Sequence, residues 1–142
     1  MPRFKALFLL LLLAFAPVIA ATPVHAVKPD EVSGPLLDTL FERAPIGMGF
    51  WDRELRYVRV NDALARINGL PVEAHLGRTI SEVLPKLEPR VEAAFRTVLE
   101  TGQPLSELEL QGETPAAPGV LRIWRTSVYP VTVANALVGV GA

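Results

Sequence analysis

The chain has 142 residues, with 14 Lys and Arg against 15 Asp and Glu, which gives a net charge of −1. This length allows one domain with a short appendage. A net charge near zero gives no excess of positive charge with which to bind the phosphates of nucleic acid. The absence of Cys excludes disulfides, thiolate metal sites and Cys nucleophiles. We therefore expect one small domain that does not bind nucleic acid.

The first 26 residues have the pattern of a targeting segment. Arg3 and Lys5 precede a stretch, residues 6–16, that contains only Ala, Leu and Phe. A basic start, a short apolar stretch and a small-residue exit are typical of a secretory signal peptide, here with a cleavage site after Ala26. A retained membrane anchor is the alternative, although a spanning helix needs about 20 apolar residues. The sequence thus predicts export to the periplasm or the extracellular space, or anchoring in the membrane through residues 1–26.

The segment after the leader is predicted to be a polar linker that runs into a helix. Pro35 is expected to open this helix, because Pro is well tolerated in the first helical turn. We assign residues 27–39 to the linker and the start of the helix, and residues 40–142 to the folded domain.

A first pair of strands is predicted over residues 47–52 and 57–60. Alternation in the second strand places Val58 and Val60 inward. Three side chains are expected on the opposite face of the strands, where they would be available for a dimer contact: Trp51, Tyr57 and Arg59.

Short helices are predicted after this pair of strands. Asn61 should cap the next helix, because its side-chain oxygen can accept an unpaired backbone N–H. Gly69 should end that helix in the left-handed conformation, Gly77 should close another short turn, and Thr79 should form a capping box with Glu82. The structural caps are therefore Asn61, Gly69, Gly77 and Thr79.

The second half of the chain is predicted to contain one longer helix and three strands. The helix, expected to be the longest of the domain, follows Glu88 and ends before Gly102, with an apolar face formed by Val91, Ala94, Phe95 and Val98. Alternating or β-branched residues indicate strands over 106–111, 120–131 and 137–142. This order of elements indicates an α+β domain around an antiparallel sheet.

Several stretches, in this order and spacing, resemble a known family. They are residues 41–47 (FERAPIG), 51–61 (WDRELRYVRVN), 67–71 (INGLP), 76–79 (LGRT), Trp124, Tyr129-Pro130 and 138–141 (VGVG). From residue 40 to residue 142 the chain resembles a PAS domain of the subgroup often found in bacterial sensory proteins. The resemblance implies a five-stranded antiparallel sheet with small helices over one face, and a space between them that often holds a small molecule.

The resemblance also implies a signalling role. The outer sheet face of such domains commonly mediates dimers or contacts with neighbouring domains. Family members usually extend the last strand into a signalling helix, whereas this sequence stops at Ala142, within that strand. We therefore expect a sensor that acts through a homodimer or a separate output protein, or a fragment truncated from a longer sensor kinase.

The sequence offers little support for cofactor or catalytic chemistry. Without Cys, a Cys-adduct flavin is excluded, and His75 is expected to be an exposed helical residue rather than a haem or metal ligand. Glu107 and Glu109 share a strand face and could perform acid–base chemistry if buried, but their alternation with Leu residues predicts that they face solvent. We expect no catalytic residue and no metal site, the alternative being a small α+β enzyme that acts on an apolar substrate.

A ligand pocket between the sheet and the helices is a more specific hypothesis than a catalytic or metal site. Six side chains are predicted to line it: Met48, Phe50, Leu64, Phe95, Trp124 and Val128. A small, mostly apolar cavity suits a small organic ligand, whereas the alternative is that these side chains fill the interior completely. The sequence therefore predicts a non-enzymatic sensory or interaction module whose ligand or cofactor is not specified.

Overall fold

A computed structural model describes residues 29–142 of the chain. Its elements, in chain order, are α1 (Pro29–Arg43), β1 (Gly49–Asp52), β2 (Tyr57–Val60), α2 (Asp62–Asn68), the 3₁₀ helix η1 (Val72–Ala74), α3 (Ile80–Val83), α4 (Arg90–Thr101), β3 (Leu105–Gly112), β4 (Arg122–Val133) and β5 (Ala136–Gly141). The predicted signal peptide or anchor, residues 1–26, lies outside the described residues. Within residues 29–142, no helix combines the length and the apolar character needed to cross a membrane.

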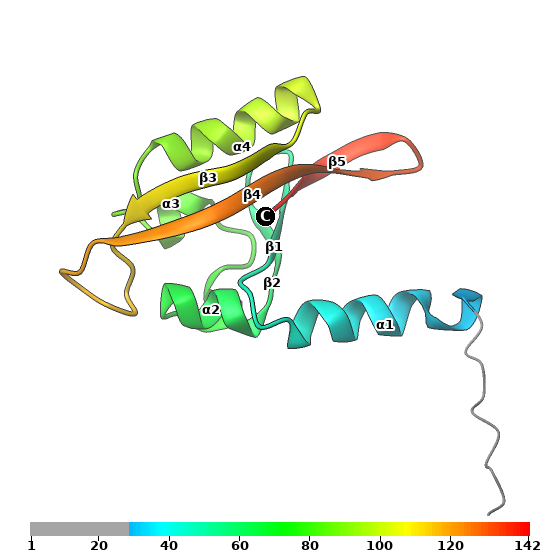
Figure 1. The fold of residues 1–142 in the computed structure, drawn as a ribbon, viewed down its shortest axis with the longest axis horizontal. Coiled ribbons are helices and arrows are strands. Elements are labelled where there is room, and N and C mark those ends of the chain that lie inside the picture. Colours follow the sequence, from blue (N-terminus) through cyan, green and yellow to red (C-terminus); the bar gives the residue numbers. More distant parts are fainter. Residues whose placement is uncertain (1–28) are drawn as a thin grey trace, which may run out of the picture. The chain divides into compact units, whose positions relative to one another are not determined.

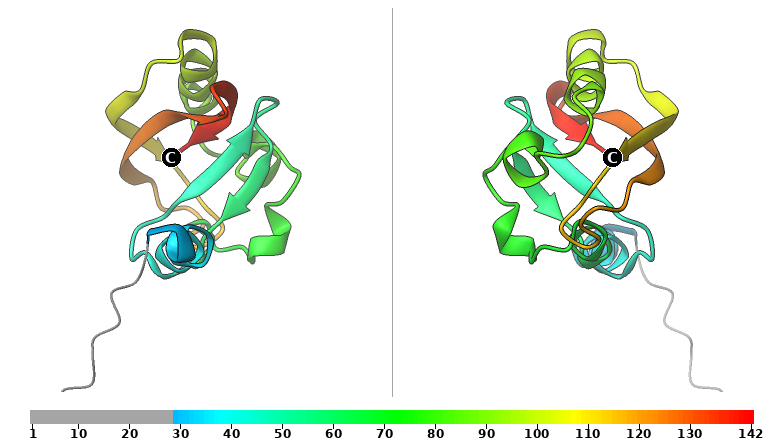
Figure 2. Two further views of the ribbon diagram at one scale, coloured as in Figure 1. Left: turned by 90° about the vertical axis from the view of Figure 1, so that its right-hand side faces the viewer. Right: turned by 90° about the vertical axis from the view of Figure 1, so that its left-hand side faces the viewer.

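The five strands form one antiparallel sheet in the order β2-β1-β5-β4-β3. The last strand of the chain therefore lies in the middle of the sheet, between the first strand and the fourth. The sheet is strongly twisted, so that β4 runs across the view of Figure 1 while β1 and β2 run up it, and Figure 2 shows the same crossing from two sides. The predicted α+β fold and its five-stranded antiparallel sheet are confirmed.

The hydrophobic core lies between the sheet and α4. Figure 1 shows α4 alongside β3 and β4, and the apolar face of this helix, which includes Val91, Phe95 and Val98, is buried. Across from it, Val128 of β4 and Val140 of β5 are fully buried. The predicted apolar face of the helix is confirmed, because its spacing of three and four residues places these side chains in one stripe.

The predicted alternation of β2 is wrong. Tyr57 and Val60 are buried, whereas Val58 is 45% exposed. The register explains the difference: Phe50 pairs with Arg59 and Trp51 pairs with Tyr57, so a bulge leaves Val58 without a partner on β1. Because Val58 is an extra residue in β2, Tyr57 before it lies on the opposite face of the sheet from the one that strict alternation predicts.

Helix α1 differs from the prediction at its start. It begins at Pro29 instead of Pro35, and Pro35 lies inside it. Pro29 provides the favourable first-turn residue that we assigned to Pro35, and an internal Pro removes one backbone hydrogen bond without ending the helix here. With 15 residues, α1 is also longer than α4, which has 12, so the predicted rank of the two helices is wrong.

The predicted caps Asn61, Gly69 and Thr79 are present, whereas the prediction that Gly77 closes the short turn is wrong, because η1 ends at His75. Asn61 accepts a hydrogen bond from the backbone N–H of Leu64 at 2.9 Å and caps α2, which Gly69 ends with a φ of 77°. Thr79 and Glu82 form the reciprocal capping box of α3. Gly77 has a φ of 73° and lies after η1, whose own C-cap is His75.

Candidate functional site

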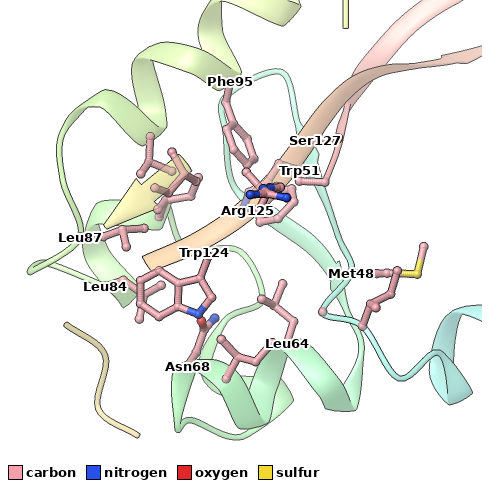
Figure 3. Close-up of a pocket in the computed structure, with 18 of the residues that line it drawn as sticks. Met48, Trp51, Leu64, Asn68, Leu84, Leu87, Phe95, Trp124, Arg125 and Ser127 are labelled. Atoms are coloured by element: carbon pink, nitrogen blue, oxygen red, sulfur yellow. The ribbon is translucent and has the colours of Figure 1, made fainter. Parts of the chain in front are cut away.

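A cavity of about 610 Å³ lies between the sheet and the helices that join β2 to β3. Its walls are mostly apolar: Figure 3 shows Phe95, Trp124 and Leu64 projecting toward it from α4, β4 and α2. Leu84 and Leu87, from the segment that joins α3 to α4, add to the same wall. An apolar hollow that opens to solvent therefore lies beside the core.

The six residues predicted to line a pocket divide into two groups. Met48, Leu64, Phe95 and Trp124 line the cavity. Phe50 and Val128 are not among its lining residues in the described part of the chain. Phe50 precedes Trp51 on β1 and points to the opposite face, where its ring lies close to Gly139, and Val128 is fully buried in the core.

Trp51 also lines the cavity, which corrects its predicted place on the outer face. Its ring contacts Phe95 edge-on, with centroids 4.8 Å apart, and is only 3% exposed. Gly49 makes this position available, because a Cβ there would lie 2.5 Å from the far edge of the indole. The indole Nε1 of Trp51 is buried without a hydrogen-bond partner among residues 29–142.

Tyr57 lies beside Trp51, and its predicted place on the outer face is likewise wrong. The two ring centroids are 4.8 Å apart, and Tyr57 is 3% exposed. Burial raises the pKa of the Tyr57 hydroxyl far above its usual value, although the nearby donors of Trp51 and Asn68 act in the opposite direction. The phenol therefore stays protonated and can donate a hydrogen bond.

A buried polar pair completes this end of the cavity. Asn68, the last residue of α2, is 3% exposed and lines the cavity, and Figure 3 shows its amide rising toward Trp124. Its Nδ2 lies 2.9 Å from Nε2 of His75, whose Nδ1 lies 2.9 Å from the carbonyl oxygen of Pro71. His75 has no exposed surface, so the expectation of an exposed helical His is wrong: both ring nitrogens are used inside the protein.

The mouth of the cavity lies along β4. This strand continues from Arg122 to Ser127 with β3 on one side, beyond the part that pairs with β5. Arg125 and Ser127 line the cavity from this part of the strand, and Tyr129 lines it from the part that pairs with β5. The Arg125 side chain is 70% exposed and reaches Glu109 at 3.9 Å, so the one charged side chain that lines the cavity in the described residues sits at its solvent end.

The carboxylates considered for catalysis do not line the cavity. Glu107 and Glu109 are exposed on β3, as the alternation of the strand predicted. Over the described residues, no group of three or more His, Cys, Asp or Glu side chains is arranged to hold a metal ion. The phenol of Tyr57, the indole of Trp51 and the amide of Asn68 are neutral polar groups of the cavity, and the charged side chain among its lining residues is Arg125 at the mouth.

Sequence reasoning missed three of these cavity residues: Trp51, Tyr57 and Asn68. A signal for the first was present, because Gly49 two residues before Trp51 leaves space over the strand for a large ring. Tyr57 could not be placed without the bulge. Asn68 appeared only as the residue before a helix-ending Gly, a position that also favours Asn for local reasons.

Comparison with known proteins identifies the family. A family profile described as the PAS fold matches residues 41–141, which is most of the chain. The chain belongs to the PAS-fold family. No curated protein sequence matches it.

Solved structures show the same PAS fold. An RNA-binding light-oxygen-voltage receptor is similar with a TM-score of 0.67 and 17% identity, over 84% of this chain and 34% of the receptor. The PAS domain of nitrogen regulation protein NR(II) from Vibrio parahaemolyticus has a TM-score of 0.60 and 14% identity, over 75% of this chain and 93% of that domain. VqmA bound to DPO has a TM-score of 0.59 and 23% identity, over 75% and 54% of the two chains.

The solved structures establish the fold, and the family profile gives its general role. The chain spans about a third of the RNA-binding receptor and about half of VqmA, so the activities of those whole proteins are not carried over. The PAS fold is a sensory or interaction module in signalling and is generally not catalytic.

Proposed function

We propose that this PAS domain is a sensor that holds a small organic molecule in the cavity between its sheet and its helices. Occupancy of the cavity changes the packing of the sheet against α4, and a second copy of the chain or a separate output protein receives that change. The domain itself performs no catalysis and contacts no nucleic acid.

The cavity is the observation that carries this proposal. A cavity of about 610 Å³ falls in the range of about 300–1,000 Å³ that is typical of small-molecule sites. Apolar walls with a few convergent polar groups are also typical of such sites. The complex of VqmA with DPO, on a similar fold, supports a ligand-binding role.

The exposed position of the acidic residues supports a non-catalytic role. General acid–base catalysis needs a carboxyl whose environment shifts its protonation toward the working pH. Glu107 and Glu109 lie in solvent on β3, and among the described residues no carboxyl side chain lines the cavity.

Native mass spectrometry of the full chain tests the proposal. The protein is purified from a host lysate, and its native mass is compared with its denatured mass. A reproducible mass excess that disappears on denaturation is the expected result, and its value begins to identify the ligand. A folded dimer without a mass excess would overturn the ligand proposal in favour of a protein-interaction role.

We also propose that residues 1–26 direct the domain out of the cytoplasm, as a cleaved signal peptide or as a membrane anchor. The basic start and the apolar stretch of this segment support export. Cell fractionation and N-terminal sequencing of the full chain test this assignment. A mature N-terminus after Ala26, or recovery of the intact chain with membranes, is expected; an intact chain in the cytoplasmic fraction would contradict it.

A further inference from the structure

The hydrogen bonds behind the cavity fix the orientation of the Asn68 amide. The carbonyl oxygen of Pro71 can only accept, so the 2.9 Å contact with Nδ1 of His75 requires a proton on that nitrogen. In the neutral ring Nε2 then carries the lone pair, and Asn68 Nδ2 donates to it at 2.9 Å. This orientation leaves Asn68 Oδ1 as an acceptor on a residue that lines the cavity.

The Tyr57 hydroxyl can supply a hydrogen-bond donor, whereas Asn68 Oδ1 is an acceptor. The Tyr57 ring lies beside those of Trp51 and His75, with centroids 4.8 and 5.2 Å away, and Tyr57 lines the cavity together with Asn68. The Trp51 N–H does not meet hydrogen-bond geometry with any described residue, yet it is buried against the phenol ring. Tyr57 lines the cavity and its phenol keeps its proton, so its O–H can donate to a molecule held there.

The interior of the cavity does not favour a charged ligand. Among its lining residues the charged side chain is Arg125, which is 70% exposed and lies beside Glu109 at the mouth. An ion that enters the inner end would lose its hydration without gaining an opposite charge, and burial of an unpaired charge costs several kcal/mol.

We propose that the cavity selects an uncharged, largely apolar molecule that carries a hydrogen-bond acceptor beside a donor on one edge, as a cyclic amide does. The acceptor binds the hydroxyl of Tyr57, and the donor binds Oδ1 of Asn68. The Trp51 N–H, which has no partner among the described residues, can then donate to the phenol oxygen, because a phenol that donates to a ligand becomes a better acceptor. This inference rests on the proposed function, since it names the class of molecule that the cavity holds.

Four bicyclic probes of nearly equal size test the inference on the full chain. 2-Quinolone carries the neutral C=O and N–H edge, N-methyl-2-quinolone lacks the donor, naphthalene lacks both groups, and 2-naphthoate carries a charge. We expect 2-quinolone to bind about tenfold more tightly than naphthalene, which corresponds to one or two net hydrogen bonds. N-methyl-2-quinolone should lie between them, and 2-naphthoate should bind less tightly than 2-quinolone.

Tyr57→Phe is the decisive variant, because it removes one hydroxyl and keeps the ring. The expected result is a loss of about tenfold in affinity for 2-quinolone with little change for naphthalene. Tyr129→Phe is the matched control, since Tyr129 lines the same cavity at its mouth and has no part in the proposed contacts. This control should leave the preference for 2-quinolone intact.

The indole N–H resonance of Trp51 provides a readout that needs no substitution. It should move downfield in the proton spectrum when 2-quinolone binds, because the indole gains a better acceptor. Equal affinities for the four probes, tighter binding of 2-naphthoate, or an unmoved Trp51 resonance in the 2-quinolone complex would each overturn the inference. A retained ligand in the native mass spectrum combined with no binding of 2-quinolone would also overturn it, while leaving the proposed function in place.

Discussion

Asn61 shows how one buried side chain joins three parts of the domain. Its Oδ1 accepts from the backbone N–H groups of Leu64 and Met48, both at 2.9 Å. Its Nδ2 donates to the carbonyl oxygens of Phe41 and Ile46, at 3.0 and 2.9 Å. The end of α1, the entry to β1 and the start of α2 thus share one amide that has no exposed surface.

Asn61→Ala should lower the free energy of unfolding by roughly 2–4 kcal/mol, because it removes a helix cap and leaves further buried backbone groups without partners. Chemical denaturation of the full chain measures the change. Asp62→Ala, at the neighbouring exposed position, is the control and should change stability by well under about 1 kcal/mol. Similar losses for both variants would contradict the role assigned to the Asn61 amide.

Two glycines with almost the same backbone conformation differ in their surroundings. Gly69 has a φ of 77° and Gly77 a φ of 73°. A Cβ at Gly69 would lie 2.2 Å from the backbone nitrogen of Ala116, whereas a Cβ at Gly77 would meet nothing within 4 Å in the described structure. Gly69 therefore brings the loop before β4, which includes the cavity residue Thr114, against the end of α2.

We predict that Gly77→Ala costs about 1–2 kcal/mol of stability, the usual penalty of a left-handed conformation for a residue with a Cβ. Gly69→Ala should cost roughly 2–5 kcal/mol, because the clash with Ala116 adds to the same penalty. Equilibrium unfolding of the two full-length variants gives the difference directly. If both cost the same, the close approach of the loop would be irrelevant to stability.

At the scale of whole elements, the sequence predicted what depends on local spacing. The order of strands and helices, the caps at Asn61 and Thr79 and the apolar stripe of α4 depend on residues within a few positions of each other. The orientation of Tyr57 was missed because it depends on a bulge, which only the pairing with β1 determines.

The candidate site was less predictable than the fold for the same reason. Met48, Leu64, Phe95 and Trp124 could be proposed because large apolar residues on inward-facing positions are common in cavity walls. The burial of His75 was not predictable, since it requires Asn68 and Pro71 to supply partners for both ring nitrogens. A polar residue at the end of a short helix is exposed by default, and only tertiary contacts reverse that expectation.

The β4–β5 hairpin shows a local conflict between sequence and conformation. Ala134 and Asn135 form its two-residue loop, between the paired residues Val133 and Ala136. Their φ angles are 49° and 65°, as in a type I′ turn, which favours Asn-Gly. Ala is poorly suited to the first of these positions because its Cβ disfavours a positive φ.

The double substitution Ala134→Asn and Asn135→Gly should therefore stabilise the domain by about 1 kcal/mol. Thermal unfolding of the full chain should show a higher midpoint for this variant. Asn135→Ala is the opposite control and should lower the midpoint, because it places a second unfavourable residue in the turn. A lower midpoint for the double variant would show that the turn is not the type I′ conformation in solution.

At the scale of the whole molecule, three carboxylates stabilise the segment between η1 and α4 and its contacts with the rest of the domain. Glu82 caps α3 through the backbone of Thr79, Glu88 accepts from the backbone of Gln111 near the end of β3, and Glu113 contacts Lys86 at 2.9 Å. The pKa of each of the three is lowered: backbone hydrogen bonding at Thr79 does so for Glu82, the guanidinium of Arg90 for Glu88, and the ammonium of Lys86 for Glu113.

These shifts predict a loss of stability in acid. A carboxyl whose pKa is lower in the folded state than in the unfolded state stabilises the fold above its unfolded pKa, near 4.5, and this contribution disappears as the pH falls through the folded pKa. The midpoint of thermal unfolding should therefore be steady from pH 7 to about pH 5 and fall below it. Glu82→Gln should flatten the acid limb of this curve, because a neutral amide does not titrate. Glu73→Gln, on η1, is the control and should leave the acid limb as steep as in the unsubstituted chain. A curve for Glu82→Gln that coincides with that of the control would show that the α3 capping box does not contribute to the acid sensitivity of the fold.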